Sequence, residues 1–175
     1  MSDQHEQPFT LVRRGRLLGL DHGDKHIGVA LSDAAWMTVR PLMVIQRRTK
    51  AEDFTIINEV ITKQQVVGVI VGLPLNPERD EEGSDRPTRA STVRRWASRL
   101  AAVLSVPVYL WEEQFSTEEA IALLMDREIA IEGRIDDHAA AVILQTFIDA
   151  HPLEVSLPAP IKRMGGASTA SPTDS

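Results

Sequence analysis

Acidic side chains stand beside several apolar segments of this sequence, and they are the residues best suited to chemistry. Asp21 directly follows the apolar run LLGL, and Glu112 and Glu113 directly follow VYLW. Asp136 and Asp137 stand at the start of a predicted last helix. Hard divalent cations such as Mg²⁺ and Mn²⁺ prefer oxygen ligands. Two or three converging carboxylates could hold one or two such ions, which activate water and stabilise the leaving oxygen of a phosphodiester.

Each of these carboxylates also has an ordinary structural explanation. Asp21 could begin a turn, a glutamate after VYLW could be a solvated strand end, and Asp136 or Asp137 could cap a helix. Successive side chains on a strand point to opposite faces, so only one of Glu112 and Glu113 can share a face with Asp21. Spacing alone does not show that the three segments meet.

Histidines offer a rival metal site. His22, Asp24 and His26 lie close together in the sequence, and His138 lies far along the chain. However, a spacing of four residues within a predicted turn does not place two histidines on one face, and no H-E-x-x-H pattern is present. We therefore expect surface histidines rather than zinc ligands.

The composition is that of an ordinary globular protein. The 175 residues are 43% hydrophobic and 25% charged, and they include no cysteine. Such a chain forms neither disulfides nor a cysteine zinc site. No apolar run is long enough to cross a bilayer, and the N-terminus lacks the layout of a signal peptide, so we expect a cytoplasmic protein without membrane contact. We predict a flexible arm over residues 1–14, one domain over 15–151 and a disordered tail over 152–175.

Apolar patterns divide the domain into strands and helices. Strands are predicted at 16–21, 27–33, 38–45, 66–74 and 106–111, and helices at 51–65, around 93–103, after Ser116 and from about Asp136. The helix around 93–103 is expected to bury the stripe Val93, Trp96, Leu100 and Val103. Short links pair the first three strands as an antiparallel meander. The parallel strands and crossover helices that follow make the fold an α/β mixed sheet.

Basic side chains are clustered although the net charge is -6. An acidic excess argues against nucleic acid as a partner, but the distribution of charge matters more than the sum. Arg95 and Arg99 lie one turn apart on a predicted helix, and Arg47 and Arg48 lie beside Lys50. For any single cluster, a solvated helix face is the favoured explanation.

Four segments of the sequence together resemble one family. GLDHGDKHIGVALSD, VIVGLPLN, WEEQFST and IDDHAAAVILQ are similar, in order and spacing, to the hallmark blocks of the YqgF (RuvX) family, from about Leu17 to Ile148. Members are described as Holliday-junction resolvases or as nucleases that mature the 5′ end of the 16S ribosomal RNA precursor. The resemblance implies an RNase H-like fold and a divalent-metal nuclease, which is a hydrolase acting on ester bonds.

The resemblance also implies roles for particular residues. The family's acidic positions fall on Asp21, Glu113 and Asp136, which are expected to bind Mg²⁺ or Mn²⁺ and to carry catalysis. The family's Asp-Glu-Arg block differs here, because Glu112 replaces the usual Asp and Gln114 replaces the usual Arg. The loss of that arginine removes a phosphate clamp.

The expected function is therefore that of a metal-dependent endonuclease in 5′-end maturation of pre-16S ribosomal RNA, a step in ribosome biogenesis. The expected partner is structured RNA, with branched DNA as the alternative, and Lys25, Arg95 and Arg99 are candidate contacts to its backbone. Resolution of a Holliday junction in DNA repair is the second hypothesis. It normally requires a two-fold dimer, whereas RNA processing allows the monomer favoured here. A non-catalytic binder of nucleic acid or ribosome precursor is the third, and Gln114 favours it. An ATP-dependent phosphotransferase is disfavoured because no second lobe is present.

Overall fold

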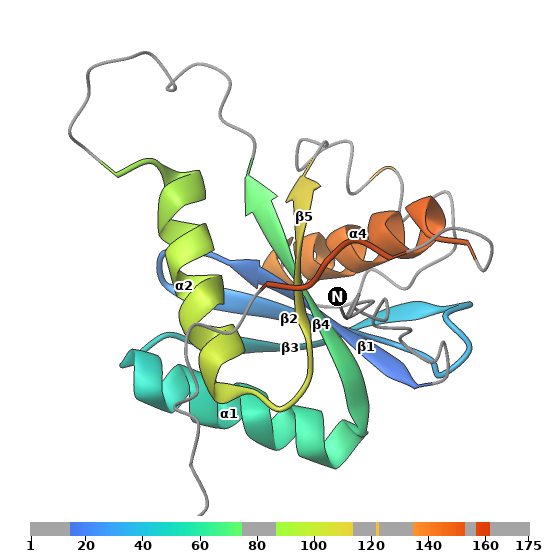
Figure 1. Ribbon diagram of the computed structural model, residues 1–175, viewed down its shortest axis with the longest axis horizontal. Helices are drawn as coiled ribbons and strands as arrows, with labels where there is room; N and C mark the ends of the chain where they lie inside the picture. Colours follow the sequence, from blue (N-terminus) through green and yellow to red (C-terminus); the bar gives the residue numbers. More distant parts are fainter. Residues whose placement is uncertain (1–14, 75–86, 114–121, 123–134, 153–156, 162–175) are drawn as a thin grey trace, which may run out of the picture.

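A mixed β-sheet forms the centre of the protein (Figure 1). The computed structural model describes residues 15–74, 87–113, 122, 135–152 and 157–161. Within these residues the sheet has five strands in the order β3-β2-β1-β4-β5. The strands are β1 (Arg16–His22), β2 (His26–Ser32), β3 (Val39–Gln46), β4 (Val66–Pro74) and β5 (Val108–Glu113).

The pairing of the strands confirms the predicted topology. β1, β2 and β3 form an antiparallel meander, and β4 and β5 are added in parallel beside β1. Because β1, β4 and β5 run the same way, their carboxyl ends meet at one edge of the sheet. β1 and β5, which carry the candidate carboxylates, therefore end on the same side of the sheet.

Helices cover both faces of this sheet (Figure 1). They are α1 (Lys50–Gln64), α2 (Arg89–Val103) and α4 (Ile135–Ala150). The start of α1 is held by a capping box, in which Thr49 and Glu52 satisfy each other's backbone N–H groups, as expected of a Thr-x-x-Glu sequence. Thr88 caps α2 by accepting a hydrogen bond from the Ser91 N–H.

The two faces of the sheet carry separate apolar cores. α1 and α2 pack on one face, where Leu18 and Leu20 of β1 are fully buried. α4 packs on the other face. There it approaches β1 so closely that a Cβ atom on Gly19 would lie 2.8 Å from the Ala140 carbonyl oxygen and 2.8 Å from the Leu144 Cβ. Glycine is therefore needed where α4 crosses β1.

Three details differ from the sequence expectations. β5 begins and ends two residues later than predicted, so both Glu112 and Glu113 lie inside the strand. Val103 is 62% exposed, because α2 ends there and Leu104, which follows the helix, enters the core in its place. Residues 157–161, assigned to the tail, contact the domain: the Ile161 N–H donates to the Val108 carbonyl at 2.8 Å.

Some expectations lie outside the described residues. These are the arm over residues 1–14, the helix predicted after Ser116, and residues 153–156 and 162–175 of the predicted tail. In the part that the structure describes, no helix is long and apolar enough to span a bilayer.

Candidate active site

Asp21 lies in β1, the central strand of the sheet. It is the second-last residue of the strand rather than the first residue after it, and it pairs with Gly28 of β2. Its side chain is partly buried. Because alternate residues of a strand share a face, Asp21 lies on the same face as Gly19, which is the face that α4 covers.

The two glutamates lie at the end of β5. Glu112 pairs with Leu73 and Glu113 pairs with Pro74, at the carboxyl end of β4. The Glu112 side chain is exposed. The preceding residue, Trp111, is directed at α4, since its indole N–H donates to the Thr146 hydroxyl at 3.0 Å. The face of β5 that Trp111 occupies is therefore the face on which Asp21 lies.

β4 lies between β1 and β5, and it carries a glycine at the level of Asp21. Gly72 of β4 pairs with Trp111 and comes one residue after Val71, the partner of Leu20. It is thus level with Asp21 in the sheet. Since glycine has no side chain, nothing projects from β4 between the positions of Asp21 and Trp111. This leaves room at the sheet edge for groups from the neighbouring strands.

The third predicted acid, Asp136, is the second residue of α4. It stands one helical turn before Ala140, the residue that contacts Gly19 of β1. The side chains of Glu113 and Asp136 lie outside the described residues. Among the side chains that are described, no three of His, Cys, Asp or Glu gather closely enough to hold a metal ion.

Two of the histidines expected at the surface are buried instead, which corrects the sequence expectation for them. His22 and His138 are only 6% and 3% exposed. The His22 ring stacks at a tilt on Trp96 of α2, with centroids 4.6 Å apart. Burial, assisted by the positive charge of Arg47, lowers the pKa of His22 from 6.5 to about 4. His22 is therefore neutral near pH 7. Its ring lies on the face of β1 opposite Asp21, packed against Trp96.

The candidate phosphate contacts lie on exposed surfaces. Lys25 occupies the turn between β1 and β2, and Arg95 and Arg99 project from α2. All three side chains are exposed and available to an anionic partner.

Sequence reasoning missed the role of Arg47, which it grouped with Arg48 and Lys50 as one basic cluster. The Arg47 side chain turns inward, and its Nη1 donates to the Gly23 carbonyl at 2.9 Å and the Asp24 carbonyl at 3.1 Å. The only signal in the sequence was Asp53, an acidic residue in the first turn of the following helix.

Proteins of similar sequence are known from several bacteria. The chain is 41% identical over 143 residues to a protein of Zymomonas mobilis subsp. mobilis, a match covering 80% of this chain and 84% of that one. It is 43% identical over 144 residues to one of Sphingopyxis alaskensis, covering 81% and 91%. Both relatives carry the name "Putative pre-16S rRNA nuclease".

Solved structures share the fold. Thermus thermophilus RuvC, in complex with a Holliday junction substrate, matches with a TM-score of 0.53 at 19% identity, over 78% of this chain and 94% of that chain. The Fowlpox virus resolvase, in complex with Holliday junction DNA, matches with a TM-score of 0.50 at 12% identity, over 77% and 97%. These similarities confirm the RNase H-like fold.

A family model extends over almost all of the described domain. It matches residues 15–150 and is described as RuvX, Holliday junction resolvase. The matched range includes all four blocks on which the family resemblance was based, so that resemblance is confirmed. This chain belongs to the RuvX family.

Proposed function

We propose that this chain is a metal-dependent endonuclease that hydrolyses phosphodiester bonds in the 5′-end maturation of pre-16S ribosomal RNA. Membership of the RuvX family supports a nuclease. Relatives of 41% and 43% identity that are named for pre-16S rRNA support the RNA substrate. The observation that carries the proposal is the common sheet edge at which β1 and β5 end, with Asp21 and Glu113 on strands separated only by β4.

Asp21, Glu113 and Asp136 are the proposed ligands of Mg²⁺ or Mn²⁺. All three supply carboxylate oxygens, the donors that these hard cations prefer. When bound, the metal would activate a water and stabilise the charge on the leaving oxygen. One turn of helix separates Asp136 from the crossing of α4 over Gly19, which supports a place near Asp21 on the same face of the sheet.

Glu113 is the proposed ligand rather than Glu112. Residues two apart on a strand share a face, and Trp111 of β5 is directed at α4. Position 113 therefore lies on the same face of the sheet as Trp111 and Asp21. Glu112 lies on the opposite face, and its side chain is exposed.

The remaining parts of the proposed site bind and orient the substrate. Lys25 in the β1–β2 turn would contact a phosphate near Asp21. The exposed Arg95 and Arg99 of α2, which packs on the face of the sheet opposite Asp21, would contact phosphates farther along the nucleic acid. Such contacts set position without reading sequence. Neutral His22 fills the opposite face of β1 against Trp96 and keeps water out from behind Asp21. We propose that the protein acts as a monomer, since an RNA end does not require two-fold symmetry.

The test measures cleavage of a 16S precursor RNA and of a four-way DNA junction with Mn²⁺ present. We expect Asp21→Asn and Glu113→Gln to lose more than the roughly 100-fold that removal of an outer partner of a metal site costs. Glu112→Gln is the matched control and should keep wild-type activity. Equal cleavage by wild type and Asp21→Asn would remove Asp21 from the mechanism.

The choice of substrate separates the two nuclease hypotheses. Cleavage of the RNA with the junction left intact supports the proposed role. Symmetrical cleavage of the junction by a dimer would instead support resolution, the activity in the family's description. If folded wild-type protein binds the RNA but cleaves neither substrate with Mn²⁺ present, the nuclease proposal is wrong and a binding role is favoured.

A further inference from the structure

The junction between β3 and α1 is attached to the β1–β2 turn through one residue. Arg47 directly follows β3, and its backbone N–H donates to the Lys25 carbonyl at 2.9 Å. This bond continues the ladder beyond the pair of His26 with Gln46. The turn that follows Asp21 is thus paired to Arg47 at its far end.

The Arg47 side chain binds the rest of the same turn. Its Nη1 donates to the carbonyls of Gly23, at 2.9 Å, and Asp24, at 3.1 Å. Together with the backbone bond, Arg47 therefore engages the carbonyls of three consecutive residues. Within the turn, the Gly23 N–H donates to the His26 carbonyl at 2.9 Å. A Cβ atom on Gly23 would lie 2.8 Å from that carbonyl oxygen, so the turn in this shape requires glycine at position 23.

A buried carboxylate holds the guanidinium in place. Asp53, in the first turn of α1, is fully buried. One of its oxygens accepts the Arg48 N–H at 3.1 Å, and the other lies 3.6 Å from the Arg47 Nε. The second distance is that of an ion pair rather than of a hydrogen bond. A buried charge is costly without such a partner, so the buried Asp53 favours a conformation that keeps the Arg47 guanidinium beside it.

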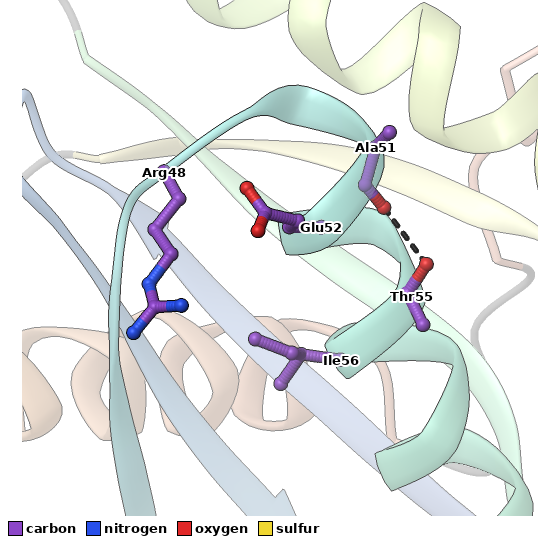
Figure 2. A pocket seen from close by; sticks show the side chains of 5 residues that line it. All are labelled: Arg48, Ala51, Glu52, Thr55 and Ile56. Carbon is purple, nitrogen blue, oxygen red and sulfur yellow. Dashed lines mark hydrogen bonds between the residues drawn. The ribbon is translucent and has the colours of Figure 1, made fainter.

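The neighbouring Arg48 has a different environment. Its side chain is exposed and lines a shallow pocket of about 310 Å³ with four residues of α1 (Figure 2): Ala51, Glu52, Thr55 and Ile56. The two arginines are adjacent in sequence, yet only Arg47 contacts the turn. Arg47 therefore makes a specific contact with the turn, whereas Arg48 contributes to the exposed basic surface.

We propose that Arg47, held by Asp53, is a positioning residue that fixes the β1–β2 turn and with it the end of β1 that carries Asp21. The inference rests on the proposed metal-dependent nuclease. Metal-binding carboxylates must be held closely in place. Residues that do not touch the metal often hold them there by contacting the ligands or the backbone that carries them.

Arg47→Lys tests the proposal, because lysine keeps the charge but has only one side-chain nitrogen. It cannot face the two carbonyls and Asp53 at the same time, as Nη1 and Nε of the planar guanidinium do. We expect the affinity for Mn²⁺, measured by electron paramagnetic resonance without nucleic acid, to fall about tenfold. The Gly23 amide should exchange its hydrogen faster, and kcat should fall while KM for the substrate changes little. Asp53→Asn leaves the carbonyl contacts in place and should show the same changes to a smaller degree.

Arg16→Lys is the matched control. Arg16 lies at the opposite end of β1, where its Nη1 donates to the Gln64 side chain of α1 at 3.0 Å. It therefore also links β1 to α1, but away from the carboxyl edge of the sheet. This variant should keep wild-type Mn²⁺ affinity and kcat. All measurements are made well below the unfolding midpoint of each variant.

Two outcomes separate this inference from the proposed function. If Arg47→Lys and Asp53→Asn bind Mn²⁺ as wild type does and only their unfolding midpoints fall, the pair is structural and the inference is overturned. If wild-type protein binds Mn²⁺ but cleaves neither RNA nor junction DNA, the nuclease proposal fails, whereas the Mn²⁺ and exchange comparisons still decide the role of Arg47.

Discussion

The imidazole of His22 lies on the indole of Trp96, with ring centroids 4.6 Å apart and planes inclined by 46°. The contact joins the end of β1 to the middle of α2. His22 directly follows Asp21 in the sequence, and its titratable ring lies in the core that β1 shares with α1 and α2. Burial of the ring, together with the positive charges of Arg47 and Arg89, lowers the pKa of His22 from 6.5 to about 4.

We expect the stability of the metal-free protein to fall between pH 6.5 and about 4 because of His22. Over this range the unfolded chain takes up a proton that the folded His22 does not, so unfolding is favoured as the pH is lowered. The free energy of unfolding should drop by up to about 1.36 kcal/mol per pH unit from this group. Above pH 6.5 the ring is neutral in both states and the contribution is constant.

His22→Phe serves as the control, since phenylalanine can stack on Trp96 and does not titrate. Urea unfolding of both proteins across this range should give a shallower pH dependence for His22→Phe. A direct check is the NMR titration of the His22 ring in wild-type protein. Titration near 6.5 would contradict the prediction.

Gly19→Ala is expected to destabilise the protein by about 1–3 kcal/mol, the usual cost of an extra methyl group in a packed core. The added Cβ would lie 2.8 Å from the Ala140 carbonyl oxygen and from the Leu144 Cβ, so α4 must move away from β1. Urea unfolding measures the loss. An unchanged midpoint would mean that α4 crosses β1 elsewhere.

Arg95→Gln and Arg99→Gln should weaken nucleic-acid binding to a similar degree for unrelated sequences. Each lost phosphate contact is expected to reduce the slope of log affinity against log salt by about 1. Binding is measured without divalent metal, so that cleavage does not interfere. Arg40→Gln, which changes an exposed arginine of the edge strand β3, is the control. Equal slopes for Arg95→Gln, Arg99→Gln and wild type would place the nucleic acid away from α2.

Gln114→Arg is expected to tighten substrate binding by about tenfold, equivalent to about 1.4 kcal/mol. The substitution restores the residue usual in the family block, and a guanidinium can bind a phosphate through two parallel hydrogen bonds. The measured quantity is KM for the 16S precursor RNA. Gln114→Lys adds the same charge without the fork and should give a smaller gain. No change in either variant would show that position 114 does not contact the substrate.

The sequence alone determined the order and type of the strands and helices that the structure describes. Local periodicity reports which faces of a segment are apolar, and short links restrict how neighbouring strands pair. The antiparallel meander and the parallel strands that follow it therefore agreed with expectation. The four family blocks determined the family and with it the RNase H-like fold. They also selected Asp21, Glu113 and Asp136, whose roles remain predictions.

The tertiary structure decided which segments meet. Pairing with β4 extended β5 through Glu113, so Glu112 and Glu113 lie on opposite faces of the sheet. It also placed the end of β5 at the same edge of the sheet as the end of β1, which carries Asp21. Packing of α2 on β1 buried His22, which local polarity had assigned to the surface. The fold of α1 placed Asp53 behind Arg47 and turned that side chain toward the β1–β2 turn. These outcomes depend on contacts between residues far apart in the chain, and local sequence patterns carry no information about the partner that a given face will meet.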